Sequence, residues 1–513
     1  MKLKVKCLDL EAGGKTIAIL NKDDALDLGV HPLDRIAITK GKKKITVVVN
    51  DTTQLVKKGE IVVYNEVRLI LGLKNNDIVE VEKRGELKSK ISIRRKIDGH
   101  RLTEDEIRSI VKDLVERDLN DIEVAAFVTS LYIHGLSVDE IVALTKAMVE
   151  TGKTLELKKK IIVDKHSLGG VPGDKTTILL IPTIASLGLT IPKTSSRAIT
   201  SPAGTADRFE NIAPVNLSIK EMKKVVEKTN GCIVWGGSLE LAPADDLFIQ
   251  IERPLNLDPL YIPSILAKKK SVGSKYLVID LPTGRGAKLK TFGEAHDVAS
   301  EFIEVSRKLG IKTTCCITFG EQPIGYAIGP ALEAREALSA IMTGEPKDLI
   351  NKVVGLAGSL LKLIGKGDEK TARRVILSHK AEKKLREIID AQGGNRNIKP
   401  EDIPVGDKRV DIISKNDGIV RWVRNNKIRE IAKIAGAPKD KGAGILLHVK
   451  IGDKVKKGDR LFTIFSENSI KLREAEKFAR ENNPVMVIKD LTTYMLIKRI
   501  EDRAHEKSFL IDR

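Results

Sequence analysis

Short runs of alternating apolar and polar residues fill the first part of the chain. The runs lie at residues 3–8, 17–20, 36–38, 45–49 and 61–63. Turns rich in glycine and aspartate separate them, and an alternation of period two is typical of half-buried strands. The pattern therefore predicts a small N-terminal β-rich domain over residues 1–86.

The apolar pattern becomes helical from Thr103 onward, where apolar residues recur every three or four positions. Three residue pairs have the spacing of a helix capping box: Thr103 with Glu106, Asn120 with Glu123, and Ser137 with Glu140. Three consecutive helices follow from this pattern. We predict an α-helical domain made of residues 87–160 together with 236–272.

A strand, a glycine-rich loop and an apolar helix succeed one another from residue 161. Two more strands are predicted near Ile191 and over residues 276–280. This order is typical of an α/β domain, for which we expect residues 161–235 with 273–400. The last segment, 401–513, mixes short strands with one helix, and its turn at 451–459 resembles the barrel-sandwich modules of biotinyl and lipoyl domains. The predicted fold class is thus α/β multidomain, with a C-terminal α+β barrel-sandwich-like domain.

Composition narrows the class of protein. None of the apolar runs in the 513 residues reaches the roughly 18 that a membrane helix needs, so we expect a cytoplasmic protein without a membrane partner. The four cysteines are scattered and predict no disulfide framework. A net charge of +19 suits either nucleic acid or a small anion, but lysines are spread along the chain and aromatic residues make up only 4%. We therefore favour a small anionic substrate and no nucleic acid.

The first loop with candidate chemistry spans residues 164–177, between a strand and a helix. Such loops present backbone N–H groups and the positive end of the helix dipole to an oxyanion, and Lys165, Ser167 and Thr177 add a cation and two hydroxyls. The loop is not a Walker A sequence, because Asp174 separates Gly173 from the lysine. It predicts a phosphate site, with a purely structural turn as the alternative.

A second loop, residues 193–207, follows the next strand and combines Arg197 with several hydroxyls. The hydroxyl side chains are Thr194, Ser195, Ser196, Thr200, Ser201 and Thr205. Loops after two strands of one parallel sheet meet at its carboxyl edge, where α/β proteins bind ligands. The two loops are therefore expected to form one site.

Together these loops resemble the paired signatures of the thymidine and pyrimidine-nucleoside phosphorylase family. A third match is Ser264-Ile-Leu-Ala-Lys-Lys269, and the likeness runs from about residue 93 to the C-terminus. The resemblance implies a pentosyltransferase in which a helical domain and an α/β domain flank a cleft. It also implies inorganic phosphate as co-substrate, no cofactor, and a homodimer that can assemble into larger homo-oligomers.

Residue roles carried over from the family fall into two groups. Phosphate would lie against Lys165, Ser167, Thr177, Ser195 and Thr205. The base would face His166, Ser264 and Lys268, with Arg253 a looser match because its spacing to Ser264 is shorter here. A solvated helix face is the alternative for Lys268 and Lys269.

Two departures from the pyrimidine pattern resemble a branch of that family, the archaeal AMP phosphorylases. The second loop reads Ala198-Ile-Thr-Ser-Pro-Ala203 where the pyrimidine enzymes are glycine-rich, and an extra N-terminal domain is present. The branch implies conversion of AMP and phosphate to adenine and ribose 1,5-bisphosphate, with CMP and UMP as further substrates. A nucleotide substrate needs a second anion site, for which we predict Gly170, Ser196, Arg197, Ala198, Ile199, Thr200, Ser201 and Lys288.

Cleavage also requires a proton for the departing base. Asp258 precedes the Ser264 helix and is the predicted donor, on the expectation that burial raises its pKa. An N-cap role is the alternative for Asp258, and His166 is the other candidate donor. No metal site is predicted. Three alternative functions stay open: a magnesium-dependent phosphoribosyltransferase, a regulatory nucleotide-binding module, and a pyrimidine-nucleoside phosphorylase.

Overall fold

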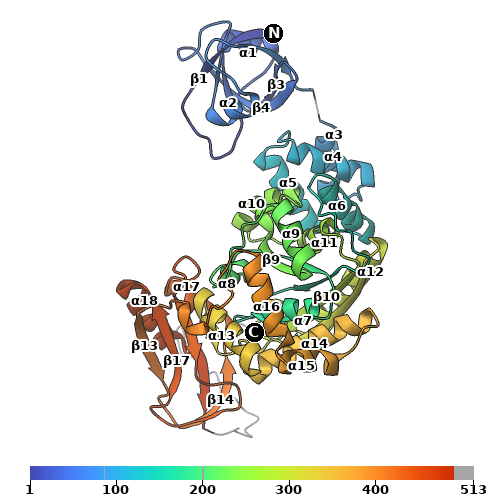
Figure 1. Ribbon diagram of the computed structural model, residues 1–513. Coiled ribbons are helices and arrows are strands. Elements are labelled where there is room, and N and C mark those ends of the chain that lie inside the picture. Colours follow the sequence, from blue (N-terminus) through green and yellow to red (C-terminus); the bar gives the residue numbers. More distant parts are fainter. Residues whose placement is uncertain (86, 199–200, 490–513) are drawn as a thin grey trace.

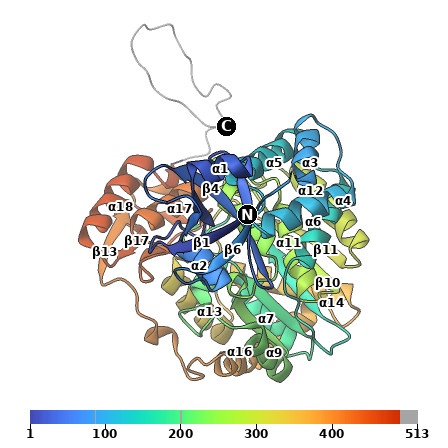
Figure 2. The same cartoon turned by 90° about the horizontal axis from the view of Figure 1, so that it is seen from above.

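The protein is a multidomain chain of mixed α and β structure, seen in a computed structural model that describes residues 1–489 except 86, 199 and 200 (Figure 1). A β domain lies at one end, helical and α/β regions follow, and the C-terminal strands lie at the side of the α/β region. Figure 2 shows the same arrangement from above, with the N-terminal β domain in front of the rest.

The N-terminal strands form a closed barrel in the order β1-β5-β2-β4-β3-β6. They are β1 (Lys2–Cys7), β2 (Ile17–Asn21), β3 (Arg35–Lys40), β4 (Lys43–Thr52), β5 (Glu60–Val63) and β6 (Ile78–Lys83), with short helices α1 (Lys22–Leu28) and α2 (Asn65–Leu71). Five of these strands are predicted from the alternating pattern. The sixth, β6, is missed because only Val79 and Val81 point inward among charged neighbours.

Helices from two separate parts of the chain build the helical region. They are α3 (Lys88–Ile97), α4 (Glu104–Val115), α5 (Asp121–His134), α6 (Val138–Glu150), α10 (Pro243–Leu255) and α11 (Tyr261–Ser271). All three predicted capping boxes are present, at the starts of α4, α5 and α6. One apolar core joins the two parts, since Phe127 of α5 packs on Phe248 of α10 with ring centroids 6.1 Å apart.

Parallel strands organise the α/β region. β10 (Tyr276–Thr283) lies between β7 (Val163–Ser167) and β11 (Lys312–Phe319), and β8 (Ile191–Ser195) pairs with β9 (Gly231–Trp235). A single bridge from Ile162 to Thr190 links β7 to β8. The surrounding helices are α7 (Thr176–Ala185), α8 (Thr205–Phe209), α9 (Ile219–Thr229), α12 (Phe292–Lys308), α13 (Pro330–Thr343), α14 (Lys347–Leu363), α15 (Glu369–Leu377) and α16 (Lys380–Ala391).

Two small antiparallel sheets form most of the C-terminal region. Their elements are β12 (Ala327–Ile328), β13 (Lys408–Ile413), β14 (Gly418–Val423), β15 (Gly444–Leu447), β16 (Lys454–Val455), β17 (Arg460–Ser466) and β18 (Val485–Ile488), with α17 (Asn425–Ile434) and α18 (Ser469–Asn482). The strand β12 belongs to the α/β segment yet pairs with β15, so the two regions share a sheet. The predicted turn at 451–459 lies between β15 and β17.

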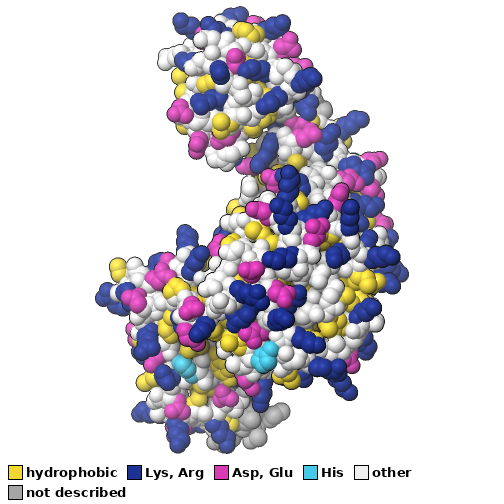
Figure 3. Space-filling model, in the orientation of Figure 1, with side chains coloured by type: hydrophobic (Ala, Val, Ile, Leu, Met, Phe, Trp, Pro, Cys, Tyr) yellow, Lys and Arg dark blue, Asp and Glu magenta, His cyan; other side chains and the backbone are white. Residues whose placement is uncertain are grey.

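Ion pairs connect the barrel to the helical region. Arg84 reaches Asp118 at 2.5 Å and Arg35 reaches Glu123 at 2.9 Å. Both acceptor carboxylates lie at or near the start of α5, so the barrel is fixed against one helix end. On the face drawn in Figure 3, basic and acidic side chains are interspersed and no single-sign patch dominates.

Candidate active site

A cluster of buried lysines is formed by the strands β7 and β8 and the helix α11. The Lys165 side chain is 2% exposed, and Lys269, equally buried, forms a 2.8 Å ion pair with the fully buried Asp164. Lys193, on β8, donates to the carbonyl of Thr194 at 2.7 Å. Lys165 and Lys193 lie on the neighbouring parallel strands β7 and β8, and Lys269 of α11 is a core residue rather than part of a solvated face.

Hydroxyl groups stand beside this lysine cluster. Lys165 Nζ lies 3.5 Å from Thr177 Oγ1, in the first turn of α7, and Ser167 Oγ donates to Asp280 at 2.8 Å. Ser195 Oγ is buried and has no hydrogen-bond partner within the described residues. A buried hydroxyl without a partner is costly, so this group is expected to be satisfied by a bound ligand.

The electrostatics of the cluster favour an anion. Burial, reinforced by the charges of Lys193, Lys269 and Lys165, holds the pKa of His166 well below its usual value. Burial and the charge of Lys269 likewise depress the pKa of Lys193. Burial is the main reason that both groups resist protonation, and the excess of neighbouring cations adds to it. An oxyanion would relieve this excess.

The second loop is braced by the carboxylate of Asp207. Its Oδ2 accepts the backbone N–H groups of Ala198 at 2.7 Å and Gly204 at 2.9 Å. Gly204 is required sterically, since a Cβ there would lie 2.5 Å from the Ala198 nitrogen. Of the predicted loop residues, Ser196 is exposed, Ser201 donates to the carbonyl of Ala203, and Ile199 and Thr200 lie outside the described residues.

Arg197, predicted to contact substrate, is held by protein groups instead. It pairs with Asp207 at 3.2 Å and with Glu210 at 2.8 Å, and its guanidinium lies 5.0 Å from the centre of the Trp235 ring. These contacts fix the start of the loop. The side chain therefore braces the start of the loop, and its contact with the substrate stays a prediction.

Gly170 and Lys288 come together as the sequence suggests. A Cβ on Gly170, whose φ is +92°, would lie 2.5 Å from the Lys288 backbone nitrogen. The Lys288 ammonium lies 4.8 Å from the centre of the Tyr261 ring and forms an ion pair with Asp258. This ion pair links the α/β segment to the connection between α10 and α11.

The environment of Asp258 differs from the predicted one. Its side chain is 53% exposed and paired with Lys288, so the expectation of a buried carboxyl among apolar neighbours is wrong. The buried acid is Glu252 on α10, 7% exposed, which accepts the Leu260 N–H. Burial, followed by the charge of Asp258, raises the pKa of Glu252 to about 7. The exposed carboxyl group of Asp258 and the buried carboxyl group of Glu252 thus lie in different environments.

The third matched segment is helix α11. Ser264 lies in its first turn, and Lys268 pairs with the buried Asp245 of α10 at 2.5 Å. Lys268 is 29% exposed, so its ammonium is anchored but accessible. Arg253, the looser match, is exposed. Thr205 begins α8, where Arg208 Nη1 lies 3.5 Å from its hydroxyl.

Sequence reasoning misses several buried partners of these residues. Asp280 accepts a hydrogen bond from the hydroxyl group of Ser167, and Lys352 of α14 forms an ion pair with Asp280 at 2.8 Å. Lys175, inside the first loop, donates to the carbonyls of Ile324 and Ala327 at 3.0 Å and is not free to bind phosphate. Lys352 lies in an ordinary amphipathic helix pattern, so no local signal could have identified it.

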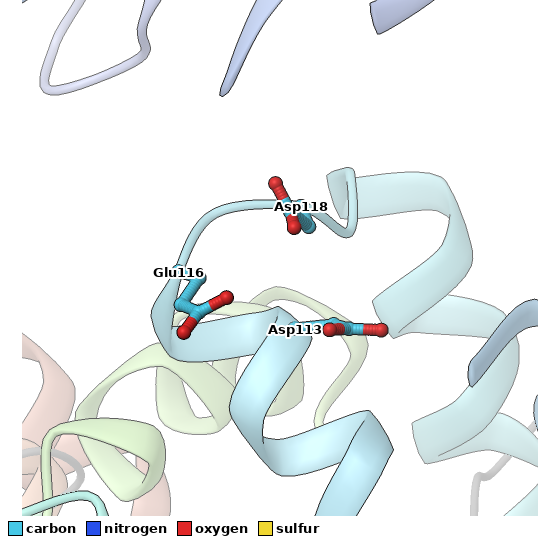
Figure 4. A group of neighbouring side chains, drawn as sticks. All are labelled: Asp113, Glu116 and Asp118. Carbon is cyan, nitrogen blue, oxygen red and sulfur yellow. The ribbon is translucent and has the colours of Figure 1, made fainter. Parts of the chain in front are cut away.

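A group of acidic side chains lies away from these loops, at the end of α4 (Figure 4). Asp113, Glu116 and Asp118 have carboxylate oxygens within 4.8 Å of one another, over the described part of the chain. Arg84 pairs with Asp118, so one member already has a cation. The group belongs to the barrel junction rather than to the lysine cluster.

Among the helices within the described residues, none is long and apolar enough to cross a membrane.

Family models match most of the chain. Residues 90–152 match the helical bundle domain of a glycosyl transferase family, and residues 159–391 match its a/b domain. Residues 419–485 match a pyrimidine nucleoside phosphorylase C-terminal domain. The first two matches contain the helices and loops described above.

Curated relatives extend over nearly the whole length. The chain is 49% identical to an AMP phosphorylase of Thermofilum pendens, with 98% of each chain covered. It is 48% identical to an AMP phosphorylase of Thermococcus kodakarensis, over 95% of this chain and 98% of that one. Among solved structures, anthranilate phosphoribosyltransferase from Thermus thermophilus superposes with a TM-score of 0.51 at 18% identity, covering 59% of this chain and 99% of that one. That likeness concerns the fold alone.

Proposed function

The chain belongs to the AMP phosphorylase family, and on that premise we propose that it catalyses the reversible phosphorolysis of AMP to adenine and ribose 1,5-bisphosphate. CMP and UMP are proposed as further substrates. The observation that carries the proposal is the buried lysine cluster, Lys165, Lys193 and Lys269, at the junction of two hydroxyl-bearing loops. The positive charge of such a cluster attracts and stabilises an oxyanion.

Inorganic phosphate is proposed to bind at the end of β7. The Lys165 ammonium and the unpartnered Ser195 hydroxyl provide charge and a donor, and Thr177 adds the first turn of α7. From there the phosphate would attack C1′ of the ribose while the base departs on the opposite side. Lysines and hydroxyls provide the electrostatic stabilisation, and we propose that no metal or cofactor takes part.

The nucleotide 5′-phosphate is proposed to lie against the second loop and Lys288. Asp207 holds the backbone at Ala198 and Gly204, so these two points of the loop are positioned before AMP arrives. Lys288 and Asp258 form an ion pair in the structure. Binding of the 5′-phosphate would draw Lys288 away from Asp258. The nucleotide would thus exchange an existing ion pair for a new one.

Proton delivery is assigned to Asp258 rather than His166. The depressed pKa of His166 leaves its imidazole neutral near pH 7, so it suits a hydrogen bond to the base better than proton donation. Once Lys288 turns to the 5′-phosphate, the carboxyl group of Asp258 is released from its ion pair and can turn to the base. Substrate binding would in this way prepare the acid.

The test is phosphate-dependent release of adenine from AMP, with ribose 1,5-bisphosphate identified by phosphorus NMR. We expect activity that needs phosphate and persists in a chelator, and a fall of about 100-fold in kcat/KM for Lys165→Met, since charged hydrogen bonds to an oxyanion are strong. Lys290→Met, at an exposed position, is the matched control. Turnover that requires magnesium and pyrophosphate would replace the proposal with a phosphoribosyltransferase.

A further inference from the structure

We propose that Ser167 accepts, rather than donates, a hydrogen bond from inorganic phosphate, and that Asp280 and Lys352 impose this polarity. The site would then select an oxyanion that still carries a proton, hydrogen phosphate or hydrogen arsenate, over sulfate. The inference deepens the proposed function and rests on it, because it concerns the same phosphate site.

Asp280 lies directly beside Ser167 in the sheet. The two residues are register partners of the parallel strands β10 and β7. The Asp280 side chain is fully buried, and Ser167 Oγ donates to its Oδ2 at 2.8 Å. Thr318 Oγ1, on β11, donates to the other oxygen at 2.6 Å. Both carboxylate oxygens therefore already accept a hydroxyl proton.

Lys352 places a positive charge against the carboxylate of Asp280. Its ammonium lies 2.8 Å from Asp280 Oδ2, and the Lys352 side chain is only 8% exposed. A buried carboxylate is retained as an anion only where a cation and hydrogen bonds compensate for lost solvation. A carboxylate has no proton to give, so the hydrogen between Asp280 and Ser167 must come from the serine.

The polarity of Ser167 follows from this arrangement. A serine hydroxyl has one proton and two lone pairs, and the proton is already engaged by Asp280. What Ser167 presents to a ligand is therefore a lone pair. A P–O–H group can donate to it, which gives a continuous chain from phosphate through Ser167 to Asp280. Chains of this kind are polarised along their length by the terminal charge.

Sulfate lacks the group that this chain requires. It resembles phosphate in size and tetrahedral shape, but at neutral pH it carries no proton. A fully deprotonated oxyanion would bring an oxygen lone pair against that of Ser167. Discrimination by an unmatched buried hydrogen-bonding group is much stronger than discrimination by size. Arsenate, which keeps a proton at neutral pH, is the matched probe.

The experiment is calorimetric titration of the full-length protein, without AMP, with phosphate, arsenate and sulfate at neutral pH. We expect phosphate and arsenate to bind at least about 10-fold more tightly than sulfate, the factor that one charge-assisted hydrogen bond provides. In Ser167→Ala, phosphate affinity should fall by about 10-fold or more while sulfate affinity stays within about twofold.

Thr318→Val is the matched control, because it removes a hydroxyl from the Asp280 oxygen that does not face Ser167. It should retain the preference for phosphate. Equal binding of all three anions by the native protein, an equal loss of phosphate and sulfate in Ser167→Ala, or loss of the preference in Thr318→Val would overturn the inference. A selective anion site without phosphate-dependent adenine release would instead refute the proposed function alone.

Discussion

Buried ionisable side chains give the loops their chemistry. Lys269 forms an ion pair with Asp164 and Lys352 with Asp280, whereas Lys165 and Lys193 lie near other cations as well as near the carboxylates of Asp174 and Asp164. Buried charge is expensive inside a protein, and a surplus of buried cations is a feature of sites that bind an anion. The unpartnered Ser195 hydroxyl points to the same conclusion.

Asp258→Asn tests the assigned proton donor. The amide can still face Lys288 and the base but cannot deliver a proton, so kcat should fall by about 100-fold or more with little change in AMP affinity. Steady-state kinetics and equilibrium AMP binding separate the two quantities. A large loss of AMP affinity with kcat intact would make Asp258 a binding residue.

Glu252→Gln tests the buried carboxyl group through stability. Because the pKa is raised from 4.5 to about 7, the folded state holds a proton that the unfolded state releases between these values. Stability therefore falls as pH rises through this window, and the cost is fully present above it. Removing the charge should raise the free energy of unfolding by about 1 to 3 kcal/mol at about pH 8 and by little below about pH 5. A gain of equal size at both pH values, measured by denaturant titration, would contradict the assignment.

The loop between β8 and α8 is the element that distinguishes this chain from the pyrimidine pattern. Its hydroxyl residues Ser196 and Ser201 can be read from the sequence, but the backbone positions of Ala198 and Gly204 depend on Asp207 and on close packing at Gly204. Such packing leaves no room for even one methyl group. The loop geometry is therefore more specific than its composition.

Gly204→Ala should distort this loop without affecting the rest of the fold. The added Cβ would meet the Ala198 nitrogen at 2.5 Å, so we expect KM for AMP to rise by about 10-fold or more, with a smaller effect on KM for phosphate. Gly355→Ala in α14 is the control, because no heavy atom lies within 4 Å of its Cβ and alanine favours helix. Equal rises in both KM values for Gly204→Ala would argue against a nucleotide-specific loop.

Local signals were sufficient to predict most elements around the site. The capping boxes at Thr103, Asn120 and Ser137 mark helix starts, and the loops after β7 and β8 have the predicted glycine and hydroxyl residues. What could not be predicted depends on distant contacts. The exposure of Asp258 follows from its pairing with Lys288, and the role of Lys352 depends on its approach to Asp280 from a helix much later in the chain.

At the scale of the whole molecule, the barrel is separate from the lysine cluster. It contacts the helical region through the ion pairs of Arg35 with Glu123, Arg84 with Asp118 and Lys15 with Asp121, away from the loops after β7 and β8. Figure 1 shows it at the end of the molecule. A direct part in catalysis is therefore not expected of it.

Arg35→Ala combined with Arg84→Ala should loosen the barrel and leave catalysis nearly unchanged. Loss of these two ion pairs leaves the exposed ion pair of Lys15 with Asp121 between the barrel and the helical region, so the orientation should loosen and the radius of gyration measured by small-angle scattering should increase. We expect kcat/KM for AMP to stay within about threefold, because distant sites rarely couple energetically and these residues lie far from the lysine cluster. A loss of about 100-fold or more with the fold intact would show that the barrel acts on the site.

The central claim is that the site recognises a nucleotide through two anion positions. The most direct test compares kcat/KM for AMP, adenosine, thymidine and uridine at saturating phosphate. Several charge-assisted contacts to the 5′-phosphate predict that AMP exceeds adenosine by about 1000-fold or more. Thymidine or uridine cleaved as efficiently as AMP would contradict the account and identify a pyrimidine-nucleoside phosphorylase.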